Sequence, residues 1–239
     1  MKKTNCNRGD SIKELYYILM KNKLGNAKEC RTLIKHGLIK VNNTVIKDHK
    51  YLVKINDIIT YKEIQLNAQP FSYYMMNKPA GYICANKDIK EKCVIDLIDN
   101  KDCYCLGRLD KDTTGLLIIT DDPTLSKKLL LPQNHVQKKY LVSTKYELTD
   151  DLVICFNQGI IIDRKIKCLP ADIEIIDKYH CYITISEGKY HQIKKMFLSC
   201  KNKVESLKRI EFGQIKLDLT LDFGQYRSLT NEELISLIK

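Results

Sequence analysis

Apolar residues in the first part of the chain repeat with a helical period. From residue 12 to residue 19 they recur three and four positions apart, and Ser11 stands where a helix N-cap is expected. Asn26 and Glu29 lie three positions apart, the spacing of a capping box, at the start of a second apolar stripe. Gly37 follows that stripe, as glycine commonly does at a helix end. The pattern predicts two short helices.

The period then changes to the alternation typical of strands. Apolar and polar residues alternate on both sides of Asn42-Asn43, which predicts a β-hairpin because asparagine readily adopts the turn conformation. One further strand, over residues 57–64, closes the unit near residue 66. These elements define a small domain over residues 10–67, preceded by a flexible tail over residues 1–9.

Strands and helices follow one another without strict alternation in the rest of the chain, residues 68–239. Strand patterns occur at residues 72–76, 103–106, 115–120, 138–144, 181–186 and 209–217. Helical patterns occur at residues 91–99, 124–131, 149–157 and 189–200. Thr230 and Glu233 have the spacing of a capping box for a final helix. This order predicts an α+β fold with a mixed, largely antiparallel sheet for the second domain.

Charge is distributed unevenly between the two predicted domains. The chain carries a formal net charge of +11, of which residues 1–67 hold +8 and residues 68–239 hold +3. An excess at one end favours a polyanionic partner, whereas a lysine-rich composition alone would not concentrate it there. A solvated helix face is the ordinary alternative for such a run of charge. The candidate contacts of the basic domain to such a partner are Lys28, Arg31, Lys35 and Lys40.

Composition argues against several classes of protein. No run of about eighteen apolar residues occurs, and no apolar stretch follows the first lysines, so neither a membrane span nor a secretory signal is expected. The ten cysteines are scattered and include no CxxC pair. Cysteines within apolar runs behave as small hydrophobic residues. A reduced, cytoplasmic protein without a zinc site is therefore predicted.

One polar stretch in the second domain, GRLDKDTTGLLIITDD at residues 107–122, is a candidate for chemistry. Asp110 follows a strand and precedes a turn at Gly115, so it lies on an anchored loop of the kind that commonly carries function. A carboxylate there is suited to be a nucleophile, a general base, a metal ligand or a turn cap. Taken alone, Asp110 and Asp112 best fit a turn-stabilising role.

Five segments, in order, resemble the motifs of the RsuA branch of the pseudouridine synthases. They are NKPAGYIC at 77–84, GRLDKDTTGLLIITDD at 107–122, VQKKYLV at 136–142, ISEGKYHQIKKMF at 185–197 and GQYRSLTNEEL at 224–234. The basic domain resembles the S4 RNA-binding domain that precedes the catalytic domain in this branch, with departures at residues 12–14 and 26–28. The resemblance implies a two-domain enzyme that isomerises uridine in RNA.

The same resemblance implies a catalytic set of Asp110, Tyr140 and Lys194. Asp110 takes the place of the family's essential aspartate, which either adds to the sugar or assists a glycal route by removing a sugar proton. Lys194 takes the place of a basic residue expected to keep a buried carboxylate ionised. Tyr140 takes the place of a ring that stacks on the target uracil. Without the motifs, the ordinary roles of the last two would be surface lysine and core tyrosine.

The substrate contacts that the resemblance implies are Arg108, Ile193, His191 and Lys78. Arg108 is expected to contact a phosphate or to fill the gap left by the extruded base, and Ile193 to wall the uracil pocket. No cofactor and no metal are expected. The reaction breaks and rejoins a glycosidic linkage without a redox step, and no phosphate-binding glycine loop or metal cluster is visible in the sequence.

The function implied is pseudouridine formation at one uridine of 16S rRNA, in the small ribosomal subunit or an assembly intermediate of it, by a cytoplasmic monomer. Tyr190 and His191, within KYHQ, resemble the small-subunit enzymes. Two alternatives remain, the same chemistry on 23S rRNA and an inactive rRNA-binding or assembly protein. The presence of Asp110, Tyr140 and Lys194 argues against the inactive protein.

Overall fold

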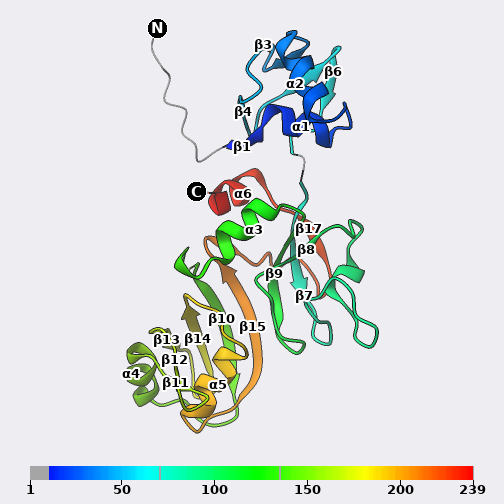
Figure 1. Cartoon of the computed structure of the whole chain (residues 1–239). Helices are drawn as coiled ribbons and strands as arrows, with labels where there is room; N and C mark the ends of the chain where they lie inside the picture. Colours follow the sequence, from blue (N-terminus) through cyan, green and yellow to red (C-terminus); the bar gives the residue numbers. More distant parts are fainter. Residues whose placement is uncertain (1–10, 70, 135, 239) are drawn as a thin grey trace. The chain divides into compact units, whose positions relative to one another are not determined.

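The computed structural model describes residues 11–69, 71–134 and 136–238 (Figure 1). The expected flexible tail, residues 1–9, lies outside these residues. Helices and strands both occur in the described part of the chain, and the predicted α+β class is confirmed. The chain forms two compact units, and each has its own set of buried apolar side chains.

The division between the units differs from the sequence-based one at the C-terminal end. The first unit extends to Phe71 and takes in helix α6 (Asn231–Ile238), while Ser72–Leu229 form the second unit. The sequence-based division placed this helix in the second domain. In the structure the Asn231 side chain donates to Asn56 Oδ1 at 2.7 Å, which ties α6 to the first unit.

The remaining elements of the first unit are short. They are β1 (Ser11–Glu14), α1 (Leu15–Lys21), α2 (Ala27–Lys35), β2 (Ile39–Val41), β3 (Thr44–Ile46), β4 (Leu52–Lys54), β5 (Ile59–Tyr61) and β6 (Ile64–Leu66). β1 pairs with β4, and the other strands form a sheet in the order β3-β2-β5-β6. Both helices and the sheet contribute to its core, which includes Leu15, Ile18, Leu19, Cys30, Ile34, Ile39, Val53 and Ile59.

Local signals in this unit are confirmed where the residue type itself dictates the turn. The Asn26 side chain accepts from the Glu29 N–H at 3.1 Å, and the Glu29 carboxylate accepts from the Asn26 N–H at 2.7 Å, so the capping box is present. Gly37 follows α2 with φ +70°. The hairpin turns at Asn42 and Asn43, whose φ values are 49° and 64°.

Two predictions for this unit were wrong. Residues 11–14 form strand β1, so α1 begins only at Leu15 and Ser11 caps no helix. The single strand expected over 57–64 is folded back into the β5–β6 hairpin. Its turn residues, Lys62 and Glu63, have φ values of 49° and 63°, a conformation that long side chains rarely adopt and that their sequence does not signal.

The second unit is built on one large sheet. Its elements are β7 (Tyr73–Lys78), η2 (Val94–Leu97), β8 (Tyr104–Leu106), β9 (Thr114–Thr120), α3 (Pro123–Leu130), η3 (Pro132–Asn134), β10 (Lys138–Thr144), α4 (Asp150–Gln158), β11 (Ile161–Ile162), β12 (Ile166–Lys167), β13 (Asp172–Ile175), β14 (His180–Ile185), α5 (Gln192–Ser199), β15 (Val204–Phe212), β16 (Ile215–Lys216) and β17 (Tyr226–Ser228). The sheet order is β13-β14-β10-β15-β9-β7-β17, with β8 paired to β9 and β16 to β15. Among the described residues its pairings are antiparallel except β9 with β15, so the predicted sheet type is confirmed.

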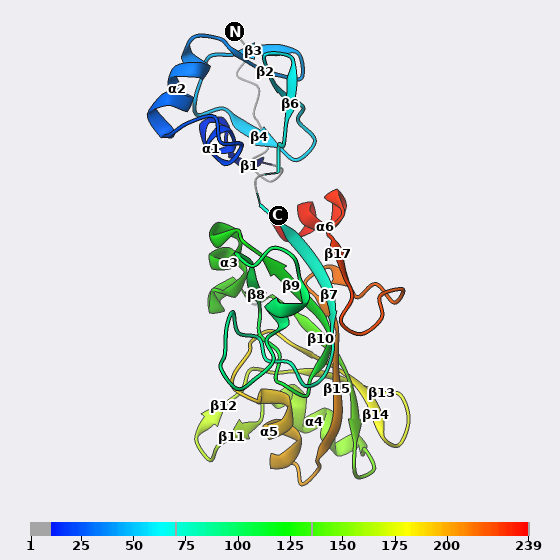
Figure 2. The same cartoon turned by 90° about the vertical axis from the view of Figure 1, so that its right-hand side faces the viewer.

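Helices α4 and α5 lie at the end of the second unit formed by β10 to β14, and α3 lies toward the other end (Figures 1 and 2). The rings of Phe156 on α4 and Phe197 on α5 pack 4.9 Å apart between their centroids. Both are fully buried, together with Val142 of β10 and Ile183 of β14. This packing fixes α5 against the sheet, so the position of its first turn is determined by the core.

Three sequence-based boundaries in this unit need correction. The helix expected over 91–99 is only the short turn η2, and the strand expected over 209–217 is the β15–β16 hairpin, which turns near Gly213. The helix expected from residue 189 begins at Gln192 because His191 has φ +52°, in the left-handed region.

The parallel contact between β9 and β15 is unusually close. Gly115 pairs with Arg209, and a Cβ atom placed on Gly115 would lie 2.3 Å from the Arg209 carbonyl oxygen. Gly115 also has φ +97°, which L-residues with side chains rarely adopt. Glycine at the end of the Asp-Thr-Thr-Gly turn therefore lets the loop before β9 enter the sheet directly beside β15.

Candidate active site

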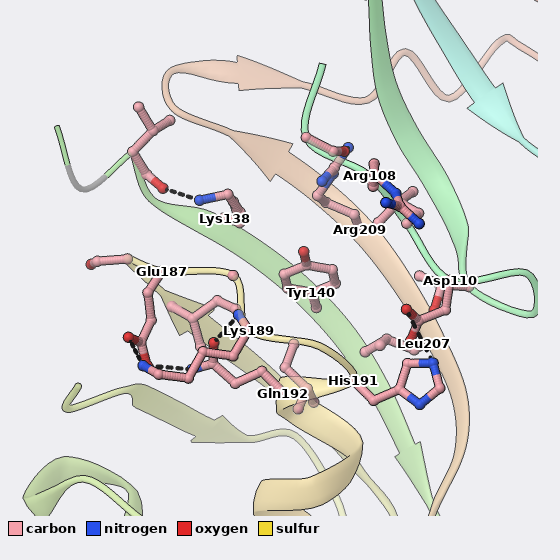
Figure 3. Close-up of a pocket in the computed structure, with 18 of the residues that line it drawn as sticks. Arg108, Asp110, Lys138, Tyr140, Glu187, Lys189, His191, Gln192, Leu207 and Arg209 are labelled. Atoms are coloured by element: carbon pink, nitrogen blue, oxygen red, sulfur yellow. Dashed lines mark hydrogen bonds and ion pairs between the residues drawn. The ribbon is translucent and has the colours of Figure 1, made fainter. Parts of the chain in front are cut away.

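A cavity of about 610 Å³ opens in the second unit beside the loop that connects β8 to β9. Five regions of the chain line it: this loop, the end of helix α3, strand β10, strand β15 and the segment that leads into α5 (Figure 3). Six of the residues singled out from the sequence are brought together in its wall: Arg108, Asp110, Tyr140, His191, Ile193 and Lys194. These residues come from parts of the chain that are distant in sequence, so the fold assembles the site.

Asp110 and Lys194 form the ion pair that the sequence predicts. Lys194 Nζ lies 3.1 Å from Asp110 Oδ2 and 2.5 Å from Asp112 Oδ1. Burial opposes the charge on Lys194, but the hydrogen bonds to Asp112 and Asp110 outweigh it and raise the pKa of Lys194. The pair is less buried than expected, since the side chains of Asp110 and Lys194 are each 25% exposed. Asp110 is therefore accessible from the cavity.

His191 stands next to this pair. Its Nε2 atom lies 3.6 Å from Asp110 Oδ1, and it is the N-cap of α5. Its backbone φ of 52° is unusual for a residue with a side chain, and such conformations cost of the order of 1–3 kcal/mol. The strained turn directs the imidazole toward the carboxylate, as Figure 3 shows.

Lys78 does not line the cavity; the structure places it behind the Asp110 loop. Its side chain is fully buried, and Nζ donates to the carbonyl oxygens of Thr113 at 2.8 Å, Pro79 at 3.0 Å and Lys111 at 3.3 Å. Burial lowers the pKa of Lys78. The end of β7 thus holds the Asp110 loop through Lys78, and in the loop that follows the Gly81 N–H adds a bond to the Lys111 carbonyl at 2.8 Å.

Arg209 is a component of the site that the sequence analysis missed. It is fully buried, lines the cavity, and donates from Nε to the Leu116 carbonyl at 2.7 Å and from Nη2 to the Gly107 carbonyl at 3.0 Å. These two bonds join β15 to both ends of the loop that carries Asp110. The strand pattern RIEF gave no signal for it, because alternation places Arg209 with Glu211, on the face opposite Ile210 and Phe212.

Tyr140 lies on β10 in the middle of the cavity wall and is almost completely buried. Figure 3 shows it between Lys138 and Asp110. Ile193, in the first turn of α5, is also buried and contributes an apolar surface. Arg108 is exposed at the edge of the cavity. The cavity wall thus offers a planar ring, an apolar surface and a carboxylate. These are the contacts that a flat, partly polar nucleobase requires.

Lys138 is a second residue that the sequence analysis did not single out. It precedes Tyr140 by two positions on β10, so both side chains face the cavity. Its Nζ donates to the Val136 carbonyl at 2.7 Å. Burial, reinforced by the nearby charge of Arg209, lowers the pKa of Lys138 to about 8, although Glu187 acts in the opposite direction. Lys138 therefore loses its proton close to the physiological range.

The predicted RNA contacts of the first unit lie mainly on one helix. Lys28, Arg31 and Lys35 are exposed on α2, and their spacing of three and four residues places them on one side of it. The Arg31 guanidinium lies 4.2 Å from the centroid of the Tyr16 ring. Lys40, on β2, is paired with Glu63 at 2.6 Å. The structure thus separates Lys40 from the three cations of α2.

The described residues lack the features of two other kinds of site. No group of three His, Cys, Asp or Glu side chains in this part of the chain is arranged to hold a metal ion. None of the described helices has the length and apolar character needed to cross a membrane. The nine cysteines that the structure describes are free thiols. The cavity beside Asp110 brings the sequence-predicted residues together and is the candidate active site.

Two family models match the chain. The model described as RNA pseudouridylate synthase matches residues 72–199, more than half of the chain, and the model described as S4 domain matches residues 18–59. With the α+β fold and the carboxylate–ammonium site, this match shows that the chain belongs to the RNA pseudouridylate synthase family. It is an isomerase that acts on RNA and carries an S4 domain before the catalytic domain.

Relatives are similar over almost the whole chain. Ribosomal small subunit pseudouridine synthase A of Vibrio cholerae is 38% identical, covering 89% of this chain and 94% of the relative. An uncharacterized RNA pseudouridine synthase of Bacillus subtilis is 36% identical over 91% of this chain and 95% of its own length. A crystal structure of a pseudouridylate synthase, 32% identical, superposes with a TM-score of 0.68 and covers 95% of this chain and 100% of that chain.

Proposed function

We propose that this protein converts one uridine of 16S rRNA to pseudouridine, in the small ribosomal subunit or an assembly intermediate of it. The observation that carries the proposal is the contact of 3.1 Å between Lys194 and Asp110 in a cavity that also holds Tyr140. The names of the Vibrio cholerae relative and its counterparts support the small-subunit target. The proposal also includes that the enzyme acts in the cytoplasm and as a monomer.

The chemistry requires one ionised carboxylate at the sugar. Pseudouridine formation breaks the N1–C1′ bond of uridine and forms a C5–C1′ bond, while C5 loses a proton and N1 gains one. Addition to the sugar and removal of a sugar proton both use Asp110 as the anion, and Lys194 Nζ lies 3.1 Å from its carboxylate. The Tyr140 ring stacks on the detached uracil, and Ile193 walls the pocket. Arg108, at the edge, contacts a phosphate or fills the gap left in the RNA stack.

The cations of α2 should supply affinity that depends strongly on salt. Replacing Lys28, Arg31 and Lys35 together with glutamine is expected to weaken binding of 16S rRNA about tenfold or more at low salt. The slope of log affinity against log salt concentration should fall by about two, because each lost phosphate contact removes roughly 0.7–0.9 from that slope. Filter binding at several salt concentrations measures both quantities.

A matched control removes three positive charges elsewhere. Lys165, Lys167 and Lys178 are exposed in the second unit, away from the residues that line the cavity. Their replacement with glutamine should change the slope by much less than the α2 variant does. Equal slopes for the two triple variants would mean that only net charge matters and that α2 is not an RNA-binding face.

Lys138 should make RNA binding sensitive to pH. Its pKa is lowered to about 8, so the side chain is a cation below that pH and neutral above it. The KM for RNA is therefore expected to rise, by about tenfold for the loss of one charged hydrogen bond, between about pH 7 and about pH 9. In Lys138→Arg the cation persists over this range, and the rise should disappear. Initial rates at several RNA concentrations, taken at each pH, measure the KM of both enzymes.

Lys139 provides the control for this pH effect. It neighbours Lys138 on β10, faces the other side of the sheet, and lies 3.5 Å from Glu174 outside the cavity. Lys139→Arg should keep the pH dependence of the wild-type enzyme. If Lys138→Arg also keeps it, the titrating group lies elsewhere, and Lys138 does not contact the RNA.

The target itself is tested by mapping pseudouridine in ribosomal RNA. Cells that lack the gene are expected to lose one pseudouridine from 16S rRNA, and the purified protein should restore it in their isolated RNA or assembly particles. Loss of a 23S site instead would reassign the target and keep the chemistry. If neither rRNA changes, and the protein still binds both, the proposal fails in favour of an inactive binding protein.

A further inference from the structure

A stacked pair of aromatic rings, of which the second is exposed, extends from the wall of the cavity. The Tyr190 ring stacks on the His191 imidazole, with ring centroids 3.8 Å apart and an angle of 20° between their planes. His191 lines the cavity, and its Nε2 lies 3.6 Å from Asp110 Oδ1. The stacked pair thus begins beside the carboxylate, where Figure 3 shows the imidazole, and continues outward to Tyr190.

Tyr190 leaves a large aromatic surface open to solvent. The residue is 73% exposed, so most of its ring remains free in spite of its contact with His191. It is nevertheless held in place, because His191 is fixed in a left-handed turn at the N-terminus of α5 and the helix is packed into the core. Lys195 Nζ lies 5.0 Å from the Tyr190 ring centroid and is paired with Asp163. An anchored ring beside a cation suits a nucleobase attached to phosphate.

We propose that Tyr190, supported by His191, is a stacking platform for the unpaired nucleobase next to the target uridine. This inference rests on the proposed function, in which the target uracil enters the cavity beside Tyr140. The neighbouring base then stays outside and stacks on the Tyr190 ring, while Lys195 faces the backbone. Stacking holds the strand in register, so the uridine beside it is presented to Asp110. Tyr190 is therefore a positioning residue and takes no part in the bond changes.

The chain offers a matched control for an exposed ring beside a lysine. Phe223 is 61% exposed, and Lys208 Nζ lies 5.6 Å from its ring centroid. Lys208 precedes Arg209 on β15, and successive residues of a strand point to opposite faces of the sheet. Because Arg209 lines the cavity, Lys208 and Phe223 lie on the other face. Stacking on Phe223 would not present a uridine to Asp110.

The first test compares three variants in steady-state assays on a 16S rRNA transcript. Tyr190→Ala is expected to raise KM about tenfold and to change kcat less than about twofold, because loss of stacking weakens binding without altering the chemistry. Tyr190→Phe should restore the wild-type KM, since the ring rather than the hydroxyl is required. Phe223→Ala should match the wild type. An unchanged KM in Tyr190→Ala, or an equal change in Phe223→Ala, would overturn the platform.

A second test needs no turnover. The chain contains no tryptophan, so Tyr190→Trp and Phe223→Trp each carry a single fluorescent indole. An oligouridylate of about ten nucleotides should quench the indole at 190, and an abasic oligomer of that length should not, because only a base stacks. The indole at 223 should respond to neither. Equal quenching by both oligomers at 190 refutes the proposal.

The two tests distinguish failure of this inference from failure of the proposed function. If the wild-type enzyme forms no pseudouridine in the transcript, the 16S target is wrong, and the fluorescence result alone decides whether Tyr190 stacks on bases. If the wild-type enzyme is active and Tyr190→Ala keeps its KM, the target stands and the platform is rejected.

Discussion

Asp110→Asn is expected to reduce pseudouridine formation by about 10⁴-fold or more, which is below detection in most assays. Asparagine keeps the size of the side chain and its hydrogen bond to Lys194, but it has no negative charge with which to act on the sugar. Affinity for RNA should remain within about threefold of the wild type, since removing an anion from the cavity does not weaken phosphate contacts. Single-turnover assays with excess enzyme, together with filter binding, measure both effects.

The neighbouring pair of Lys195 and Asp163 provides the control. Lys195 Nζ lies 2.6 Å from Asp163 Oδ2, so this is the same kind of ion pair one residue along α5, and Asp163 does not line the cavity. Asp163→Asn should keep at least about half of the wild-type rate, as expected for an exposed ion pair. Substantial turnover by Asp110→Asn would remove Asp110 from the chemistry, whatever its contact with Lys194.

Gly115→Ala is expected to destabilise the second unit by about 3 kcal/mol or more, from a steric clash combined with backbone strain. The new Cβ atom would lie 2.3 Å from the Arg209 carbonyl oxygen, which belongs to the backbone of a central strand and cannot turn away. Relief requires β9 and β15 to move apart, and Arg209 would then release the Gly107 and Leu116 carbonyls. Denaturant unfolding followed by circular dichroism measures the loss, and turnover should fall with it.

Gly188→Ala is the control for this substitution. A Cβ atom on Gly188 would have no neighbour within 4 Å, so the free energy of unfolding should change by less than about 0.5 kcal/mol. If Gly115→Ala were as stable as Gly188→Ala, the close approach of β9 and β15 would not be a requirement of this fold.

The sequence predicts elements well where neighbouring residues alone determine the backbone. Strand β10 covers the predicted residues 138–144 because its alternation is regular, and the hairpin at Asn42-Asn43 follows from the turn preference of asparagine. The turn at Lys62-Glu63 carries no such preference and is imposed by the pairing of β5 with β6. The addition of α6 to the first unit depends on contacts between distant residues, which no local pattern encodes.

The residues of the site also fall into those that the sequence predicts and those whose position depends on distant contacts. The resemblance to known motifs identified Asp110, Tyr140 and Lys194, and the structure places all three in one cavity. It did not identify Arg209, because a single arginine in a strand is usually a surface residue and its burial depends on the parallel pairing with β9. The supporting position of Lys78 was missed for a related reason: a lysine in a loop motif suggests contact with a ligand, whereas its partners here are carbonyls of its own chain.

The parallel pairing of β9 with β15 also determines when a newly made chain becomes active. Gly115 and Arg209 are separated by most of the second unit, so contact between them requires closure of a long loop, which is slow compared with forming hairpins. During synthesis, Asp110 leaves the ribosome well before the strand that brackets its loop, and domains generally fold as they emerge. We therefore expect the nascent polypeptide to gain catalytic competence only after residues 204–212 have been translated, when the N-terminal helices have already been made.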